Sequence, residues 1–127
     1  VVGYLLFDLR RLGVGPRELV ERVEQAIVAT LAQFGIDAFP RSDAHGVYVD
    51  HPDGARKIAS LGLRIRHGCS YHGLSLNVAM DRQPFSRIDP CGHAGLQTID
   101  LARLGVQATW DEAADLLARS LVSQFLP

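Results

Sequence analysis

The sequence is poor in cysteine and lysine and contains no long run of apolar residues. Its 127 residues include two cysteines, Cys69 and Cys91, far fewer than a small disulfide-stabilised secreted domain requires. We therefore expect free thiols and a cytoplasmic protein. No stretch of about 18 apolar residues is available to cross a membrane, so we expect no membrane contact. The net charge of −1 gives no electrostatic reason to bind nucleic acid.

Motifs for nucleotide, hydrolase and metal chemistry are also absent from the sequence. No GxxxxGK or GxGxxG phosphate-binding motif occurs, and no serine lies in a GxSxG motif. Cys69-x-x-His72 has a spacing that zinc sites use, but it stands alone, and a zinc site needs about four ligands. The sequence therefore predicts no cofactor and no metal site.

The chain length and the 47% apolar content predict one globular domain, 1–127, with a hydrophobic core. The first nine residues are mostly apolar and lack an initiator Met, so we expect a domain truncated at its N-terminus. Pro16 and the apolar spacing after it predict a helix that ends at Gly35. Thr109 and Glu112 form a capping box, which predicts a helix at the C-terminal end.

Several short strands are predicted between these helices. Residues 1–9, 36–39 and 46–50 are rich in strand-forming side chains, and residues 51–56, HPDGAR, predict a turn. Two further strand-like runs flank His67 and Gly68, which predicts a hairpin with a two-residue loop. Together these elements predict an α+β fold with mixed β-sheets and packed helices.

The register of this hairpin follows from its loop. If Arg66 faces Cys69, then Ser60 faces Ser75 and Gly62 faces Gly73. Glycine weakens a strand, so two facing glycines suggest a groove where a ligand or another backbone approaches the sheet. A bulge, or tight packing against a helix, would explain the glycine pair equally well.

Lys57 is the one lysine in the sequence, beside twelve arginines. Strand alternation places it with Ala59 and Leu61 on the apolar side of the hairpin, which faces the core. An ammonium group at an apolar face loses hydration, and this favours the neutral amine and proton exchange near neutral pH. A bulge near the turn at residues 51–56 would reverse this assignment.

Cys91 lies in the run RIDPCGHAG, between Pro90 and Gly92, where packing gives no reason for a thiol. A thiol with a pKa of about 8.5 is mostly protonated at neutral pH, so a cysteine nucleophile gains from a neighbouring cation or base. Lys57 is a candidate for that neighbour.

The runs GVYVD, KIASLGLRIRHGCSYHGLSLNVAMD and RIDPCGHAG resemble the octanoyltransferases of lipoate biosynthesis, and the similarity extends back through residues 10–44. The resemblance implies a fold like the catalytic domains of lipoate and biotin protein ligases. It also implies a cytoplasmic enzyme that moves an octanoyl group from acyl carrier protein to a lysine of a lipoyl domain. The implied acceptors are the lipoyl domains of 2-oxoacid dehydrogenases and the glycine cleavage H protein.

The same resemblance implies roles for individual residues. Cys91 corresponds to the nucleophile that carries the acyl thioester, and Lys57 corresponds to the lysine that lowers the pKa of this thiol. The implied substrate contacts are Ser60, Leu61, Gly62, Gly73, Leu74 and Ser75. These residues coincide with the facing segments of the predicted hairpin.

One family segment is missing from the chain. The glycine-rich run RGG-x-x-T-x-H-G-P-G-Q helps to form the acyl pocket in the family and would precede Val1. We therefore expect the chain as given to be inactive or to depend on a partner chain. Two alternatives stay open: a ligase-like protein that activates acids with ATP, and a catalytically incomplete fragment that binds the lipoyl domain or the carrier protein.

Overall fold

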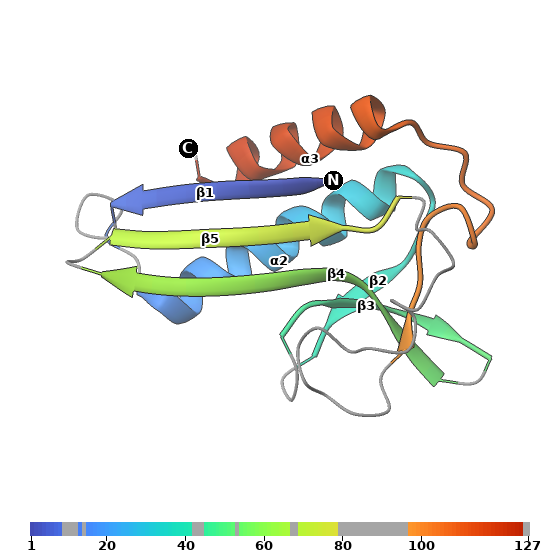
Figure 1. Ribbon diagram of the computed structural model, residues 1–127, viewed down its shortest axis with the longest axis horizontal. Coiled ribbons are helices and arrows are strands. Elements are labelled where there is room, and N and C mark those ends of the chain that lie inside the picture. Colours follow the sequence, from blue (N-terminus) through green and yellow to red (C-terminus); the bar gives the residue numbers. More distant parts are fainter. Residues whose placement is uncertain are drawn as a thin grey trace.

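The computed structural model describes residues 1–8, 13, 15–41, 45–52, 54–66, 69–78 and 97–125. They form a six-stranded sheet with two helices on one face (Figure 1). The strand order is β1-β5-β4-β3-β2, with antiparallel neighbours, and the short β6 pairs in parallel with β4. The predicted α+β fold, a mixed sheet with packed helices, is confirmed.

In chain order, the elements are β1 (Val2–Asp8), α2 (Pro16–Gln33), β2 (Ala38–Pro40), β3 (Val47–His51), β4 (Gly54–Arg66), β5 (Cys69–Leu76), β6 (Gln97–Thr98) and α3 (Trp110–Phe125). Figure 1 shows α2 passing behind β4 and β5, with α3 on the same side of the sheet. No helix in the described ranges combines the length and the hydropathy needed to cross a membrane.

Helix α2 begins and ends where the sequence predicts. Pro16 occupies the first turn, where a missing N–H costs no intrahelical hydrogen bond. Gly35 follows the helix with φ of 79°, in the left-handed region that glycine adopts without a Cβ clash. The N–H of Ile36 then donates to the carbonyl of Leu31 at 3.0 Å, which closes the C-terminal turn.

The predicted capping box at the start of α3 is present. The N–H of Glu112 donates to Oγ1 of Thr109, and the N–H of Thr109 donates to Oε1 of Glu112, both at 3.1 Å. The hydrogen bond from the Thr109 N–H, together with the Thr109 side chain, stabilises the charged carboxylate and lowers the pKa of Glu112. Two of the four N–H groups that lack an intrahelical acceptor at the start of α3 are therefore satisfied by the capping box.

The two helices bury their apolar faces against one side of the sheet. Helix α2 and α3 pack against each other as well as against the strands. The buried apolar residues of this core include Val23, Ile27 and Leu31 from α2, Ala113 and Leu117 from α3, Val47 and Val49 from β3, Ile58 and Ala59 from β4, Leu74 and Leu76 from β5, and Ile99 and Leu101 after β6.

The β4–β5 hairpin has the predicted register over its whole length. Arg66 pairs with Cys69, Gly62 with Gly73 and Ser60 with Ser75, without a register shift. The loop residues His67 and Gly68 lie outside the described part of the chain. An uninterrupted ladder excludes a bulge at the glycine pair, which was one of the alternatives to a groove.

Candidate functional site

The predicted catalytic lysine lies on β4 and is almost completely buried, with 1% of its surface exposed. Its predicted partner, Cys91, belongs to residues 79–96, which are outside the described part of the chain. The pairing of the two residues therefore stays a prediction.

A β-bulge decides which face of the sheet Lys57 occupies. Val47 of β3 pairs with Ala59, and the next residue, Tyr48, pairs with Lys57, so Ile58 is an extra residue on β4. Ile58 and Ala59 both belong to the core beneath the helices, as does Val47. Directly paired residues share a face of the sheet. Lys57 therefore lies with Tyr48 on the side that points away from α2 and α3.

The prediction that Lys57 shares the core side with Ala59 is wrong for this reason. The prediction assumed that side chains alternate regularly between the two faces of β4. In the structure, Ile58 and Ala59 together occupy one step of the ladder, so the alternation shifts by one residue. We call the side that carries Tyr48, Lys57, Ser60 and Gly62 the far face. Ser60 and Gly62 belong to it because their neighbours Ala59 and Leu61 pack in or against the core.

Lys57 is part of a row of side chains that runs across four strands. Phe39 pairs with Tyr48, Tyr48 with Lys57, and Lys57 with Thr98 of β6. The rings of Phe39 and Tyr48 are stacked, with centroids 6.5 Å apart. Nζ of Lys57 lies 5.8 Å from the centroid of the Tyr48 ring, a distance at which the ring face attracts an ammonium group.

A second cation lies near the same aromatic ring. The guanidinium carbon of Arg41 is 5.3 Å from the centroid of Tyr48. Tyr48 is fully buried, and its hydroxyl donates to the carbonyl of His45 at 3.4 Å. The buried ring thus has two basic side chains near it, and its contact with Nζ helps to fix where the Lys57 amine lies.

Thr98 offers a polar group next to Lys57 in the sheet. The N–H of Ile99 donates to the carbonyl of Lys57 at 2.9 Å, which holds β6 beside this part of β4. Oγ1 of Thr98 is buried and makes no hydrogen bond within the described ranges. A threonine hydroxyl can donate or accept, so it is able to serve either form of a neighbouring group.

The predicted substrate contacts fall into three facing pairs, as the register requires. Ser60 faces Ser75, Leu61 faces Leu74 and Gly62 faces Gly73. The pairs do not share a side, because Leu74 is buried in the core and Leu61 packs against it. A ligand on the far face can therefore meet the side chains of the serines but only the backbone of the leucines.

The far face is open at Gly62. Within the described part of the chain, a Cβ added there would meet no heavy atom within 4 Å. Tight packing against a helix, the second alternative to a groove, therefore does not explain this glycine. The observation agrees with a site where a ligand approaches the sheet closely.

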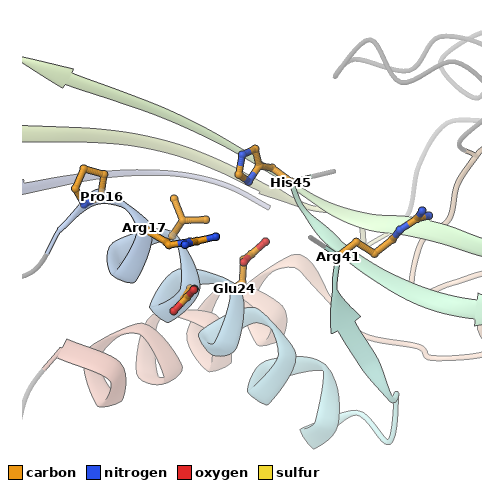
Figure 2. Close-up of a pocket in the computed structure, with 7 residues that line it drawn as sticks. Pro16, Arg17, Glu24, Arg41 and His45 are labelled. Carbon is orange, nitrogen blue, oxygen red and sulfur yellow. The ribbon is translucent and has the colours of Figure 1, made fainter. Parts of the chain in front are cut away.

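A cavity of about 410 Å³ lies between the first turns of α2 and the residues on either side of 42–44. Figure 2 shows the carboxylate of Glu24 pointing from α2 toward His45, whereas the guanidinium of Arg41 extends away from it. The lining residues are Pro16, Arg17, Val20, Glu21, Glu24, Arg41 and His45. Its walls carry both charge signs.

Glu24 is the most buried charged group of this cavity, with 6% of its surface exposed. Oε2 of Glu24 accepts a long hydrogen bond of 3.4 Å from the N–H of Gly46. Burial raises the pKa of Glu24, while the Gly46 hydrogen bond and the nearby His45 oppose this rise and Glu21 adds to it. Glu24 thus connects α2 to the residue that precedes β3.

Gly46, which accepts no side chain, lies close to both Ala59 and Lys57 of β4. Its φ of 130° is unfavourable for residues with a side chain. A Cβ at this position would lie 2.7 Å from the carbonyl oxygen of Ala59 and 3.1 Å from Cε of Lys57. The backbone of Gly46 therefore lies against both the bulge and the stem of the lysine.

Sequence reasoning missed Glu24, Gly46, Tyr48 and Thr98. One signal was available for Glu24, which lies four residues after Val20 and three before Ile27, beside the apolar stripe of the helix. No comparable signal marks Tyr48, because its contact with Lys57 depends on the bulge.

Metal binding is not indicated within the described ranges, where no three His, Cys, Asp or Glu side chains cluster. The side chains of Cys69 and His72 are outside the described part of the structure, although their backbones belong to β5.

Comparison with known proteins places this architecture in a family. Residues 1–122 match the model of the lipoyl protein ligase A/B catalytic domain. The chain belongs to this family. It is similar to the octanoyltransferase of Paraburkholderia phymatum, with 54% identity over 129 residues that cover 97% of this chain and 51% of the relative. The octanoyltransferase of Burkholderia thailandensis is 52% identical over 124 residues, which cover 97% of this chain and 49% of the relative.

The resemblance to octanoyltransferases that the sequence predicts is confirmed by these matches. The chain spans about half the length of the curated relatives it matches. The family membership thus applies to a catalytic-domain segment, and the activity of a whole relative does not transfer with it.

Solved structures of ligases share the fold. Biotin protein ligase from Aquifex aeolicus superimposes with a TM-score of 0.76 at 12% identity, covering 97% of this chain and 50% of that one. A bipartite lipoate protein ligase from Thermoplasma acidophilum, described with its E2 lipoyl domain, gives a TM-score of 0.70 at 18% identity and covers 97% and 49%. At these identities the likeness shows the fold alone, and it confirms the predicted likeness to ligase catalytic domains.

Proposed function

We propose that the protein takes part in octanoyl transfer, moving the acyl group from acyl carrier protein to a lysine of a lipoyl domain through a thioester on Cys91. The similarity to octanoyltransferases over 97% of the chain supports the reaction class. The position of Lys57 is the observation that supports placing the reaction at this site. The bulge turns this buried amine onto the far face, which also carries Ser60 and the open Gly62.

The proposed chemistry has two acyl transfers. In the first, the Cys91 thiolate attacks the carrier thioester, a new S–C bond forms, and the carrier thiol leaves with a proton that Lys57 supplies. In the second, the neutral amine of the acceptor lysine attacks the acylated Cys91. An amide bond forms, the thioester bond breaks, and Lys57 takes up the proton that the attacking nitrogen loses.

The proposed substrate contacts are Ser60, Leu61 and Gly62 on β4 and Gly73, Leu74 and Ser75 on β5. Backbone groups and the two serines would line the acyl chain on the far face, while Leu61 and Leu74 hold the hairpin against the core. The proposed partners are the carrier protein and the lipoyl domains of 2-oxoacid dehydrogenases and the glycine cleavage H protein. A cytoplasmic location follows within the proposal, because Cys91 has to remain a reduced thiol.

Mass spectrometry after incubation with octanoyl-carrier protein tests the proposal. We expect a mass increase of one octanoyl group on Cys91, absent in Cys91→Ser and retained in Cys69→Ser. The test uses this chain and a version extended by the parts of a curated relative that this chain does not cover. Failure of the extended protein to acquire an adduct on Cys91 would refute the proposed intermediate.

A ligase-like activity is the second candidate, because the fold is shared with ligases, including a lipoate-protein ligase A solved with ATP bound. Transfer that requires ATP and survives Cys91→Ser would favour this candidate. Binding of the carrier protein without acyl transfer would instead indicate a binding module.

A further inference from the structure

The stem of Lys57 lies against the backbone of Gly46, where there is no room for a side chain. Gly46 has φ of 130°, and a Cβ there would lie 2.7 Å from the Ala59 carbonyl oxygen and 3.1 Å from Cε of Lys57. Carbon atoms in good contact are separated by about 3.5–4.0 Å. Glycine is thus required at position 46 both by the backbone conformation and by the space that Lys57 occupies.

Glu24 and Tyr48 fix the positions of Gly46 and of the Lys57 side chain. The carboxylate of Glu24 accepts the N–H of Gly46 at 3.4 Å and, being 6% exposed, belongs to the packed surface of α2. Tyr48, two residues after Gly46, is paired with Lys57 across the ladder and places its ring 5.8 Å from Nζ. A chain of contacts therefore runs from Glu24 of α2 through Gly46 and Tyr48 to Lys57.

We propose that Gly46 and Glu24 are positioning residues for Lys57: Gly46 leaves the space in which the lysine stem lies, and Glu24 holds the Gly46 backbone so that this space stays open. The inference rests on the proposed octanoyl transfer, because it assigns a purpose to the placement of the amine. Neither residue contacts the reacting atoms in this proposal.

A methyl group at position 46 has to displace Cε of Lys57 or the carbonyl of Ala59 by several tenths of an ångström. A 1 Å misplacement in a catalytic constellation can reduce the rate about a hundredfold. We therefore expect Gly46→Ala to slow acylation of Cys91 at least about tenfold.

Gly54 provides a matched control for this substitution. Its φ of 124° is similar to that of Gly46, but a Cβ there would meet none of the described residues within 4 Å. Gly54→Ala therefore introduces comparable backbone strain without touching Lys57. We expect Gly54→Ala to acylate Cys91 at the wild-type rate.

A direct readout of the lysine keeps this test independent of the proposed activity. Lys57 is the one lysine in the sequence, so labelling with ¹³C-lysine gives one Cε signal by NMR. We expect this signal to move in Gly46→Ala and to stay in place in Gly54→Ala. An unmoved signal in folded Gly46→Ala, or equal movement in both variants, would overturn the inference. A protein that fails to acylate Cys91 while the signal moves as expected would contradict the proposed function instead.

A pair of substitutions at Glu24 covers the case in which Gly46→Ala does not fold. Glu24→Gln keeps an oxygen that accepts the Gly46 N–H, whereas Glu24→Leu removes the acceptor at similar volume. We expect the Cε signal and the acylation rate to be retained in Glu24→Gln and altered in Glu24→Leu. Equal behaviour of the two variants would overturn the assignment of Glu24, because the hydrogen bond would then not matter.

Discussion

The two halves of β4 differ in how they present their side chains. From Ala59 to Arg66 the strand pairs with β5 without interruption, and between Ala59 and Gly62 core residues alternate with residues of the far face. Before this point the strand pairs with β3 and β6, and the extra residue Ile58 shifts the register by one position. The regular half positions the serines and glycines of the proposed groove, and the bulge brings Lys57 onto the same side.

Removing the bulge should have the largest effect on the protein. Deletion of Ile58 would restore regular alternation by making Lys57 the direct neighbour of Ala59, so Lys57 would stay on the far face. The deletion would remove a fully buried side chain from the core and shift the backbone of β4 before Ala59 by one residue. We expect the free energy of unfolding to fall by more than about 4 kcal/mol, measured by urea denaturation. Ile58→Val, which keeps the bulge, should cost only about 0.5–1.5 kcal/mol. Equal stability of the two variants would show that the bulge carries no special role.

Substitutions on neighbouring positions of β5 test the alternation in the regular half. Leu74 has 2% of its surface exposed within the core, so Leu74→Ala should reduce the free energy of unfolding by about 2–5 kcal/mol. Ser75 belongs to the far face, and Ser75→Ala should change it by no more than about 0.5 kcal/mol. Similar losses in the two variants would contradict the assignment of faces.

The buried Glu24 gives a pH-dependent test of the bulged region. Folding raises the pKa of this carboxyl above its ordinary value of 4.5, so the folded state holds the proton more tightly than the unfolded chain. Its contribution to stability is thus fully present below pH 4.5 and is lost as the pH rises through the folded pKa. Glu24→Gln should weaken this fall in stability, measured by urea midpoints across the pH range. An identical pH dependence in both proteins would exclude the effect.

The smallest effect on stability is expected at Gly62. Its φ is not positive, and a Cβ there would meet no atom of the residues that the structure describes within 4 Å. Gly62→Ala should therefore change the free energy of unfolding by about 0.5 kcal/mol or less. The added methyl group would occupy the proposed acyl groove, so KM for the octanoyl donor should rise. A stable variant with an unchanged KM would place the acyl chain elsewhere.

Local signals in the sequence were sufficient for most of the fold. Pro16, Gly35 and the Thr109–Glu112 capping box act within a few residues of themselves, so the helix ends can be predicted from them. The hairpin register follows from its loop and from strand alternation. These features depend on few long-range contacts.

The environment of Lys57 could not be predicted in the same way. Its face is set by a bulge whose extra residue, Ile58, looks like any other apolar strand residue. Gly46 and Glu24 contact each other over 22 positions of sequence, through folding of the whole sheet against α2. The predicted roles of Cys91 and Lys57 came from the family resemblance, and their contact remains to be tested.

The most direct test of the central claim is the pH dependence of alkylation at Cys91, followed by peptide mass mapping so that Cys69 is counted separately. If the far-face amine of Lys57 lies beside this thiol, Cys91 should react at a lower pH in the wild-type protein than in Lys57→Met, because the cation stabilises the thiolate. An identical alkylation midpoint in the two folded proteins would contradict the account.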